Sequence, residues 1–272
     1  MSVLDWHPHP EVWALLAASA GGYVLAQRRW GAATRSQKTL FGLGLLTLLV
    51  ASEWPVHELA ERALYSVHMV QHLLISLIAP PLLMRGVPAP VWRGLLGAGA
   101  RLRVVRTLSK PLLALVIFNA VIVLTHWPAL VDASLRSEPI HFGVHLLLFS
   151  SAMLMWVPVL SPILELPALS YPGRMFYLFL QSLVPTVPAS FLTFGDSVLY
   201  RFYAAAPRVT SLSALDDQRL AGLIMKLAGG FVLWAVIALL FMKWYSAERS
   251  SDWDALAWRD VDRQMRTGLS RG

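Results

Sequence analysis

The chain has 272 residues, of which 56% are hydrophobic, only 14% are charged and none is cysteine. Soluble domains usually carry about 25% charged residues, so the composition indicates a membrane protein and excludes a disordered chain or an ordinary cytosolic enzyme. Without cysteine there are no disulfides and no thiolate metal sites. Any bound metal must therefore be held by imidazole, carboxylate, thioether or backbone oxygen.

Several apolar stretches are long enough to be membrane spans, because a helix of about 20 residues crosses the roughly 30 Å hydrocarbon core. We therefore predict an all-α integral membrane protein, a bundle of seven transmembrane helices. In chain order the predicted spans are 11–27, 38–52, 64–84, 111–127, 140–160, 172–194 and 220–242. Pro80 and Pro81 are expected to bend or break the third span, and Pro185 and Pro188 the sixth.

Lysine and arginine are distributed unevenly between the two sides of such a bundle. Seventeen of the 23 lie in the first, third and fifth connections and after the last span, against five in the other connections. Cytoplasmic loops are enriched in these residues, so we predict an N-terminus outside and a C-terminus in the cytoplasm. The net charge of +7 then reflects topology rather than nucleic-acid binding. Lys226, inside the last span, is expected to snorkel outward.

We divide the chain into a membrane domain, residues 1–245, and a cytoplasmic amphipathic tail, residues 246–272. The tail mixes apolar residues such as Trp253, Leu256 and Val261 with acids and arginines. This pattern is typical of a helix that lies on the inner surface of a membrane.

All eight histidines lie outside the spans or in their outer parts. Two pairs spaced four residues apart begin the third and fifth spans, and each pair shares one helical face. A fifth histidine ends the fourth span. Ionisable residues at membrane depth are costly and usually face the bundle interior, where they serve a ligand or a pathway. We therefore predict a metal site formed by His68, His72, His126, His141 and His145.

The other histidines and the nearby polar residues have simpler interpretations. A lone histidine at a span end is more often interfacial than a ligand, and we interpret His7, His9 and His57 in this way. Four polar residues on the same side are candidates to orient the imidazoles by hydrogen bonds. For each of them the alternative is a loop residue or a helix cap. These candidates are Gln71, Asp132, Asp217 and Gln218.

The expected metal is copper, ahead of zinc or haem iron. Imidazole suits copper, zinc, iron and nickel, and the affinity order for divalent ions peaks at Cu²⁺. Met69, Met153 and Met155 would add thioether character that favours Cu⁺. Methionines in spans are more often packing residues, so we assign none of them as a ligand.

A series of short motifs runs in order from about residue 65 to residue 230. The series is His68-Met69-Val70-Gln71-His72-Leu73-Leu74, Ala79-Pro80-Pro81-Leu82-Leu83, Thr125-His126-Trp127-Pro128 with Asp132, His141 with His145, Tyr200 with Tyr203, and Asp217-Gln218. Together these motifs resemble the caa3-type cytochrome c oxidase assembly factor family, CtaG.

The resemblance implies a seven-span protein of the bacterial inner membrane that helps to build a haem–copper oxidase by delivering or inserting copper. It implies no enzymatic activity of its own. The implied partners are an oxidase subunit in the membrane and a periplasmic copper donor. Val144 stands where this family often has an acidic residue, which removes one carboxylate partner for His141 or His145.

Three alternatives to copper delivery stay open. A membrane-embedded zinc hydrolase would hold Zn²⁺ with three histidines and use Asp132 or Asp217 as the base. A haem-binding electron carrier would use paired histidines as axial ligands, although the inner half of the bundle has no histidine for a second haem. A metal-free scaffold for oxidase subunits needs no ligands at all.

Overall fold

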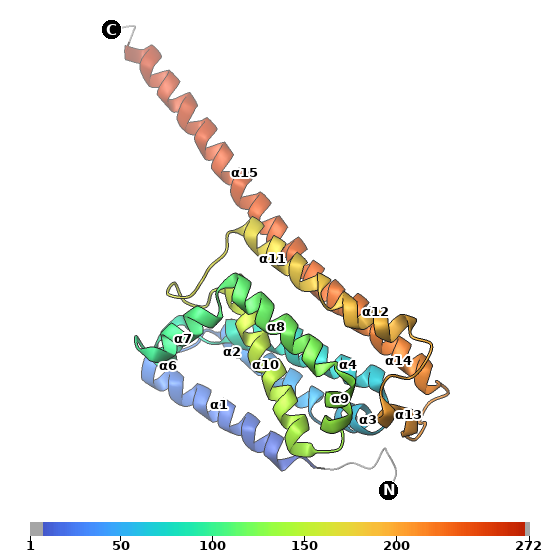
Figure 1. Ribbon diagram of the computed structural model, residues 1–272. Coiled ribbons are helices and arrows are strands. Elements are labelled where there is room, and N and C mark those ends of the chain that lie inside the picture. The colour runs from blue at the N-terminus through green and yellow to red at the C-terminus, as the bar shows by residue number, and fades with distance from the viewer. Residues whose placement is uncertain (1–7, 270–272) are drawn as a thin grey trace.

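The computed structural model describes residues 8–269, with side chains through residue 249, and every regular element among these residues is helical (Figure 1). Five helices are long and apolar enough to cross a membrane: Arg35–Arg62, Tyr65–Gly86, Glu138–Leu160, Tyr171–Phe194 and Ala214–Arg249. The pair Ala100–Leu108 and Pro111–Thr125, bent by 75°, is a sixth candidate. The protein is thus an all-helical, multi-pass membrane protein with five to six candidate spans.

The first predicted span coincides with the helix Pro10–Trp30, which is not among these candidates. Its glycines and tryptophans make it less apolar than the leucine-rich helices that follow. The number seven and the orientation in the membrane therefore stay predictions.

The helical segments are numbered along the chain, and two of them, η1 and η2, are π-helical turns inside longer helices. In order they are α1 (Pro10–Trp30), α2 (Arg35–Ala51), α3 (Val56–Arg62), α4 (Tyr65–Leu73), η1 (Leu74–Ile78), α5 (Ala79–Gly86), α6 (Ala89–Leu96), α7 (Ala100–Leu108), α8 (Pro111–Thr125), α9 (Pro128–Ser134), α10 (Glu138–Leu160), α11 (Tyr171–Leu183), α12 (Thr186–Phe194), α13 (Arg201–Ala205), α14 (Ala214–Leu223), η2 (Ile224–Ala228) and α15 (Gly229–Leu269).

The third span stays continuous through its two prolines. Pro80 has no N–H to bond to the Ser76 carbonyl, as an α-helix would require, and the helix widens into η1 just before it. The freed Ser76 carbonyl accepts a hydrogen bond from Nε1 of Trp156 on α10, at 3.2 Å. A π-helical turn and one tertiary hydrogen bond thus absorb the expected break, and α4 remains a regular helix.

The sixth span stays one helix, Tyr171–Phe194, but its regular hydrogen bonding is interrupted for two residues at its prolines, between α11 and α12. The Ser182 carbonyl lies at this interruption. It accepts hydrogen bonds from the Thr186 hydroxyl at 3.3 Å and from Nζ of Lys226 at 3.4 Å, and Nζ also bonds to the Thr186 hydroxyl. The expectation that Lys226 snorkels outward is therefore wrong, because the interrupted helix offers the ammonium group partners inside the bundle.

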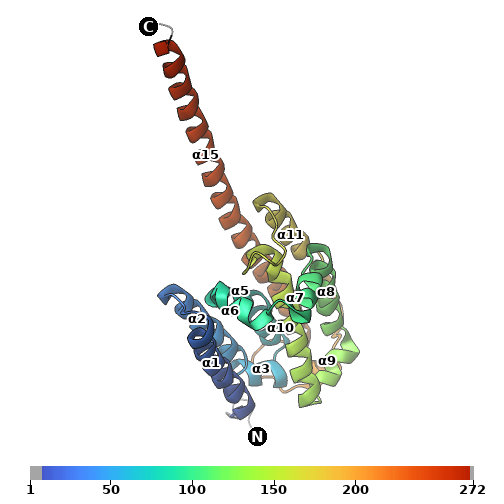
Figure 2. The ribbon, with the colours of Figure 1, turned by 90° about the vertical axis from the view of Figure 1, so that its left-hand side faces the viewer.

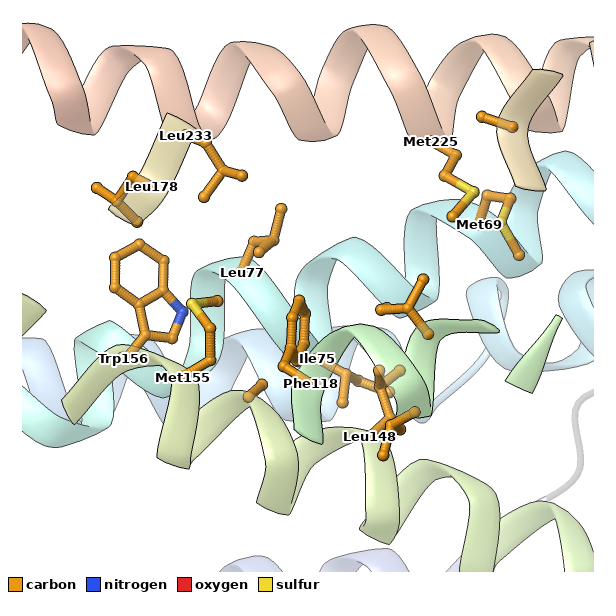
Figure 3. Packing of buried hydrophobic residues seen from close by; sticks show 14 of the residues in the cluster. Met69, Ile75, Leu77, Phe118, Leu148, Met155, Trp156, Leu178, Met225 and Leu233 are labelled. Carbon is orange, nitrogen blue, oxygen red and sulfur yellow. The ribbon is translucent and has the colours of Figure 1, made fainter. Parts of the chain in front are cut away.

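Close helix contacts fix the frame around α4. α5 packs between α2 and α10, while α14 packs on α4 and α11 packs on α15 (Figures 1 and 2). Figure 3 shows the apolar core between these helices, where Trp156 and Met155 of α10 face Leu178 of α11 and Leu233 of α15. This packing holds α4 against α14, while η1 and α5 of the same span pack against α10.

The two ends of the bundle differ in what they carry. α6 and α7 lie at one end, with the arginines of the third connection, while α3, α9 and α13 lie at the other end (Figure 1). The described histidines occur just before α1, on α3, on the first turns of α4 and α10, and directly after α8, so they belong to the second end; His7 lies outside the described residues. α15 continues unbroken past residue 245 and extends beyond the bundle (Figures 1 and 2).

Candidate metal site

The N-terminus of α4 is fixed by a carboxylate from another helix. The N–H of Tyr65 donates to Oδ2 of Asp217 at 2.7 Å, and the N–H of Ser66 donates to Oδ1 at 3.3 Å. The Ser66 hydroxyl bonds to the same Oδ1. Asp217 is 1% exposed, so it is a buried cap that satisfies the free N–H groups of the first turn. The two histidines of α4 follow directly.

Three imidazoles from α4 and α10 come together below this cap. One ligand atom each from His68, His72 and His145 lies within 4.8 Å of the other two. The ring centroid of His72 lies 4.3 Å from that of His68 and 5.3 Å from that of His145. A shared ion with metal–nitrogen bonds of about 2.1 Å would draw the donors within about 4.2 Å of one another. Small ring rotations are therefore sufficient to bind one ion.

Four of the six nitrogens of this triad, His68, His72 and His145, lack protein hydrogen-bond partners among the described residues. Among the described residues none bonds to Nδ1 of His68, to either nitrogen of His72 or to Nε2 of His145. His68 is 3% exposed and His72 is 4% exposed. Buried polar groups are normally satisfied, so the unbonded nitrogens fit a site that ligates a cation.

His126 and His141 lie on either side of the triad. The His126 ring centroid is 5.7 Å from that of His72, and the His141 ring centroid is 4.2 Å from that of His145. Nδ1 of His126 lies 2.7 Å from the carbonyl of Ile122, which accepts its hydrogen. The structure therefore brings all five predicted histidines into one continuous group, with three in a single ligating cluster.

Comparison with known proteins agrees with the motifs quoted above. The family model described as cytochrome c oxidase caa3 assembly factor matches residues 20–247. The chain belongs to this family. Comparisons with curated proteins and with solved structures found no match. The matched segment of this assembly factor contains all five histidines of the group.

A second cluster in the assembly factor joins a carboxylate to two imidazoles. His57 and Glu61 of α3 and His141 of α10 offer ligand atoms within 4.8 Å of one another. Oε1 of Glu61 lies 3.1 Å from Nε2 of His141 and 3.3 Å from Nε2 of His57. His9 continues the row, with its ring centroid 4.5 Å from that of His57 and Nδ1 2.9 Å from Oε1 of Glu11.

This second cluster was not predicted from the sequence. His57 was interpreted there as an isolated interfacial residue, and Glu61 was not among the candidate ligands. The signal was present, because His57 and Glu61 are spaced four residues apart on one helix. Glu61 also supplies His141 with a neighbouring carboxylate from another helix, although Val144 occupies the position where the family often has an acid.

The polar residues predicted to orient the imidazoles have other partners. Nε2 of Gln71 donates to the Ala51 carbonyl at 2.7 Å and lies 3.1 Å from Nδ1 of His57, so it contacts the second cluster rather than the triad. Asp132 accepts from the N–H of Phe202 at 3.1 Å. Asp217 caps α4, as described above.

Gln218 and two tyrosines hold the segment between α12 and α14 over the histidines. Gln218 accepts from the N–H of Leu199 at 2.7 Å and donates to the Ser197 carbonyl at 3.2 Å. The hydroxyl of Tyr65 donates to that of Tyr200 at 3.0 Å, which donates to the His126 carbonyl at 3.1 Å. Burial raises the pKa of Tyr200 to about 12, so this hydroxyl keeps its proton at neutral pH and remains a donor.

A pocket borders the triad on the side of His126. It is lined by residues of α4, η1, α8, α11, η2 and α15, and its polar lining includes His72, Ser76, His126, Gln181 and Lys226. His72 therefore lies between the other imidazoles of the triad and this partly apolar pocket inside the bundle.

Proposed function

We propose that this protein delivers copper to a caa3-type cytochrome c oxidase during its assembly, and that His68, His72 and His145 bind the ion. One observation carries the proposal: histidines from two separate helices converge inside an apolar bundle, and four of their six imidazole nitrogens have no partner among the described residues. Membership of the oxidase assembly factor family supports the oxidase as the recipient of the copper. The all-imidazole donor set supports copper, because affinity for divalent ions peaks there.

The surrounding residues support a carrier rather than a permanent cofactor site. His141 lies beside His145, and His126 lies beside His72. An ion at the triad can therefore exchange one imidazole at a time for a neighbouring one. Stepwise exchange of this kind allows a site to bind an ion and still release it to a partner.

The proposal includes a seven-span topology with the histidines at the periplasmic side of the bacterial inner membrane. The lysines and arginines of the third connection, at the opposite end of the bundle, support this orientation. Copper would then come from a periplasmic donor and pass to an oxidase subunit in the same membrane without crossing the bilayer. Residues 1–245 form the membrane domain in this arrangement, and residues 246–272 the cytoplasmic tail.

Metal analysis of the purified protein tests the proposal. Wild-type protein loaded with copper should retain about one ion per chain or more, and the variant His72→Ala/His145→Ala should lose most of it, because affinity falls steeply with the number of ligands. The matched control is Ser109→Ala/Ser151→Ala, which removes two other buried hydroxyls, each bonded to a carbonyl three or four positions earlier and neither lining the pocket beside the triad. A hydrogen bond of this kind contributes only about 1 kcal/mol, so this control should keep its fold and its copper.

Whether the oxidase receives this copper is tested in cells that lack the assembly factor. Complementation with wild-type protein should restore copper to the caa3 oxidase, and complementation with His72→Ala/His145→Ala should not. Full oxidase assembly with the double variant would contradict copper delivery and leave a metal-free scaffold. Retention of zinc in place of copper, together with esterase or amidase activity, would instead identify a zinc hydrolase.

A further inference from the structure

The contact between His126 and Met69 has a chemical property that the triad lacks. Nε2 of His126 lies 3.4 Å from Sδ of Met69. The carbonyl of Ile122, 2.7 Å from Nδ1 on the other side of the ring, can only accept a hydrogen bond. A neutral imidazole has one N–H, so its proton is on Nδ1, and Nε2 presents a lone pair to a sulfur that also presents lone pairs.

Two lone pairs that face each other in this way cannot form a hydrogen bond with one another. A protonated ring would allow a second N–H, but His126 is 7% exposed and no carboxylate lies beside its ring within the described part of the chain. An unpaired buried charge is strongly disfavoured. The remaining arrangement, a nitrogen and a sulfur lone pair aimed at the same region, is that of two ligands of one cation.

His72 completes the set. Its ring centroid lies 5.7 Å from that of His126, and both of its nitrogens lack partners among the described residues. His72, His126 and Met69 line the same pocket. Met225 of η2 lines it too, and Figure 3 shows this side chain pointing toward Met69. Two thioethers and two imidazoles therefore border one cavity.

We propose that Met69, His126 and His72 form a second copper site, selective for Cu⁺, which borders the triad and shares His72 with it. Thioether ligands select Cu⁺, whereas imidazoles alone accept divalent ions as well. An ion bound as Cu⁺ passes from the triad by exchanging His68 and His145 for His126 and Met69, while His72 remains bound. The inference rests on the proposed function, since it describes the step that follows copper capture.

The experiment uses the full-length protein in detergent and the variant Met69→Leu, which keeps an apolar side chain of similar volume. Cu⁺ is titrated under ascorbate in competition with bicinchoninate, and Cu²⁺ is titrated separately. X-ray absorption at the copper edge of the Cu⁺-loaded protein reports sulfur ligands directly. The matched control is Met155→Leu, because Met155 is as buried as Met69, lies beside Trp156 (Figure 3) and does not line the pocket with His72 and His126.

We expect Met69→Leu to weaken Cu⁺ binding about tenfold or more, to change Cu²⁺ binding less than about twofold, and to remove the sulfur signal. Met155→Leu should change none of these. A purely structural sulfur–ring contact would give a Cu⁺ spectrum with nitrogen ligands only and equal affinities in all three proteins, and would overturn this inference alone. Wild-type protein that binds no copper would overturn the proposed function as well. If Met69→Leu does not fold, the wild-type spectrum decides, because absence of sulfur there excludes the site.

Discussion

His72 and His126 differ in how their ring nitrogens are held. His126 gives one nitrogen to the Ile122 carbonyl, which fixes both the tautomer and the ring orientation. His72 has no bonded nitrogen among the described residues, so either of its nitrogens is available as a ligand. A ring of fixed orientation, His126, beside a ring that can turn, His72, suits ligand exchange, because His72 can remain bound to the ion while the other ligands change.

Asp217 acts on the triad through the backbone, because it caps the helix that carries two of the three imidazoles. Asp217→Ala leaves the N–H groups of Tyr65 and Ser66 without their cap, which costs about 1–2 kcal/mol. The first turns of α4 then fray, and copper binding weakens because these turns carry His68 and His72. Thermal unfolding in detergent and copper titration measure the two effects.

The neighbouring acid is the matched control for this prediction. Asp216 is exposed, contacts the Ser213 hydroxyl at 2.6 Å and lies 3.7 Å from Arg219. Asp216→Ala should therefore change stability by less than about 0.5 kcal/mol and leave copper binding intact. Equal effects of the two variants would show that the cap does not position α4.

Single-residue roles could be predicted from sequence only where they depend on local spacing. The four-residue spacing of His68 with His72, and of His141 with His145, is sufficient to place each pair on one face. The partner of Asp217, in contrast, is Tyr65, 152 positions earlier in the chain. Nothing in the neighbourhood of either residue indicates that pairing, because it depends on how α14 packs on α4.

Helices α2 and α5 approach closely at small residues. A Cβ on Gly86 would lie 2.6 Å from the backbone nitrogen of Phe41, and backbone atoms do not move aside cheaply. Gly86→Ala should therefore separate the two helices and destabilise the protein by about 1–3 kcal/mol. Thermal unfolding in detergent measures this loss.

Gly21 on α1 is the control for that substitution. A Cβ at this position would meet no heavy atom within 4 Å. Gly21→Ala should leave stability unchanged or raise it by about 0.5–1 kcal/mol, since alanine favours a helix over glycine. An unchanged unfolding temperature for Gly86→Ala would mean that α2 and α5 are not held as closely as described.

The elements themselves were predicted well where apolar runs were long, and poorly where tertiary contacts decide. The predicted third span 64–84 and the observed helix Tyr65–Gly86 nearly coincide. Its prolines did not break it because Trp156 bonds to the freed carbonyl of Ser76. The short helix α3 lies between predicted spans and has no apolar run of its own, which is why the cluster of His57 and Glu61 was missed.

At the scale of the whole molecule, the separation of arginines and histidines at opposite ends predicts the orientation in the membrane. The natural absence of cysteine allows this to be tested without background labelling. Ala98 lies between α6 and α7, Ser211 lies between α13 and α14, and both are exposed. A single cysteine at either position should therefore react with a maleimide whenever the reagent reaches that side.

Because arginine-rich loops remain cytoplasmic, Ser211→Cys should react with a membrane-impermeant maleimide in intact spheroplasts. Ala98→Cys should react only after the membrane is permeabilised, which also provides the control for reactivity. Ser2→Cys tests whether the first helix crosses the membrane. Labelling of this cysteine from outside means that α1 crosses the membrane and that the spans number seven. The reverse pattern for Ala98 and Ser211 would place the histidines on the cytoplasmic side, where a periplasmic donor cannot load them, and the copper would then have to enter from the cytoplasm.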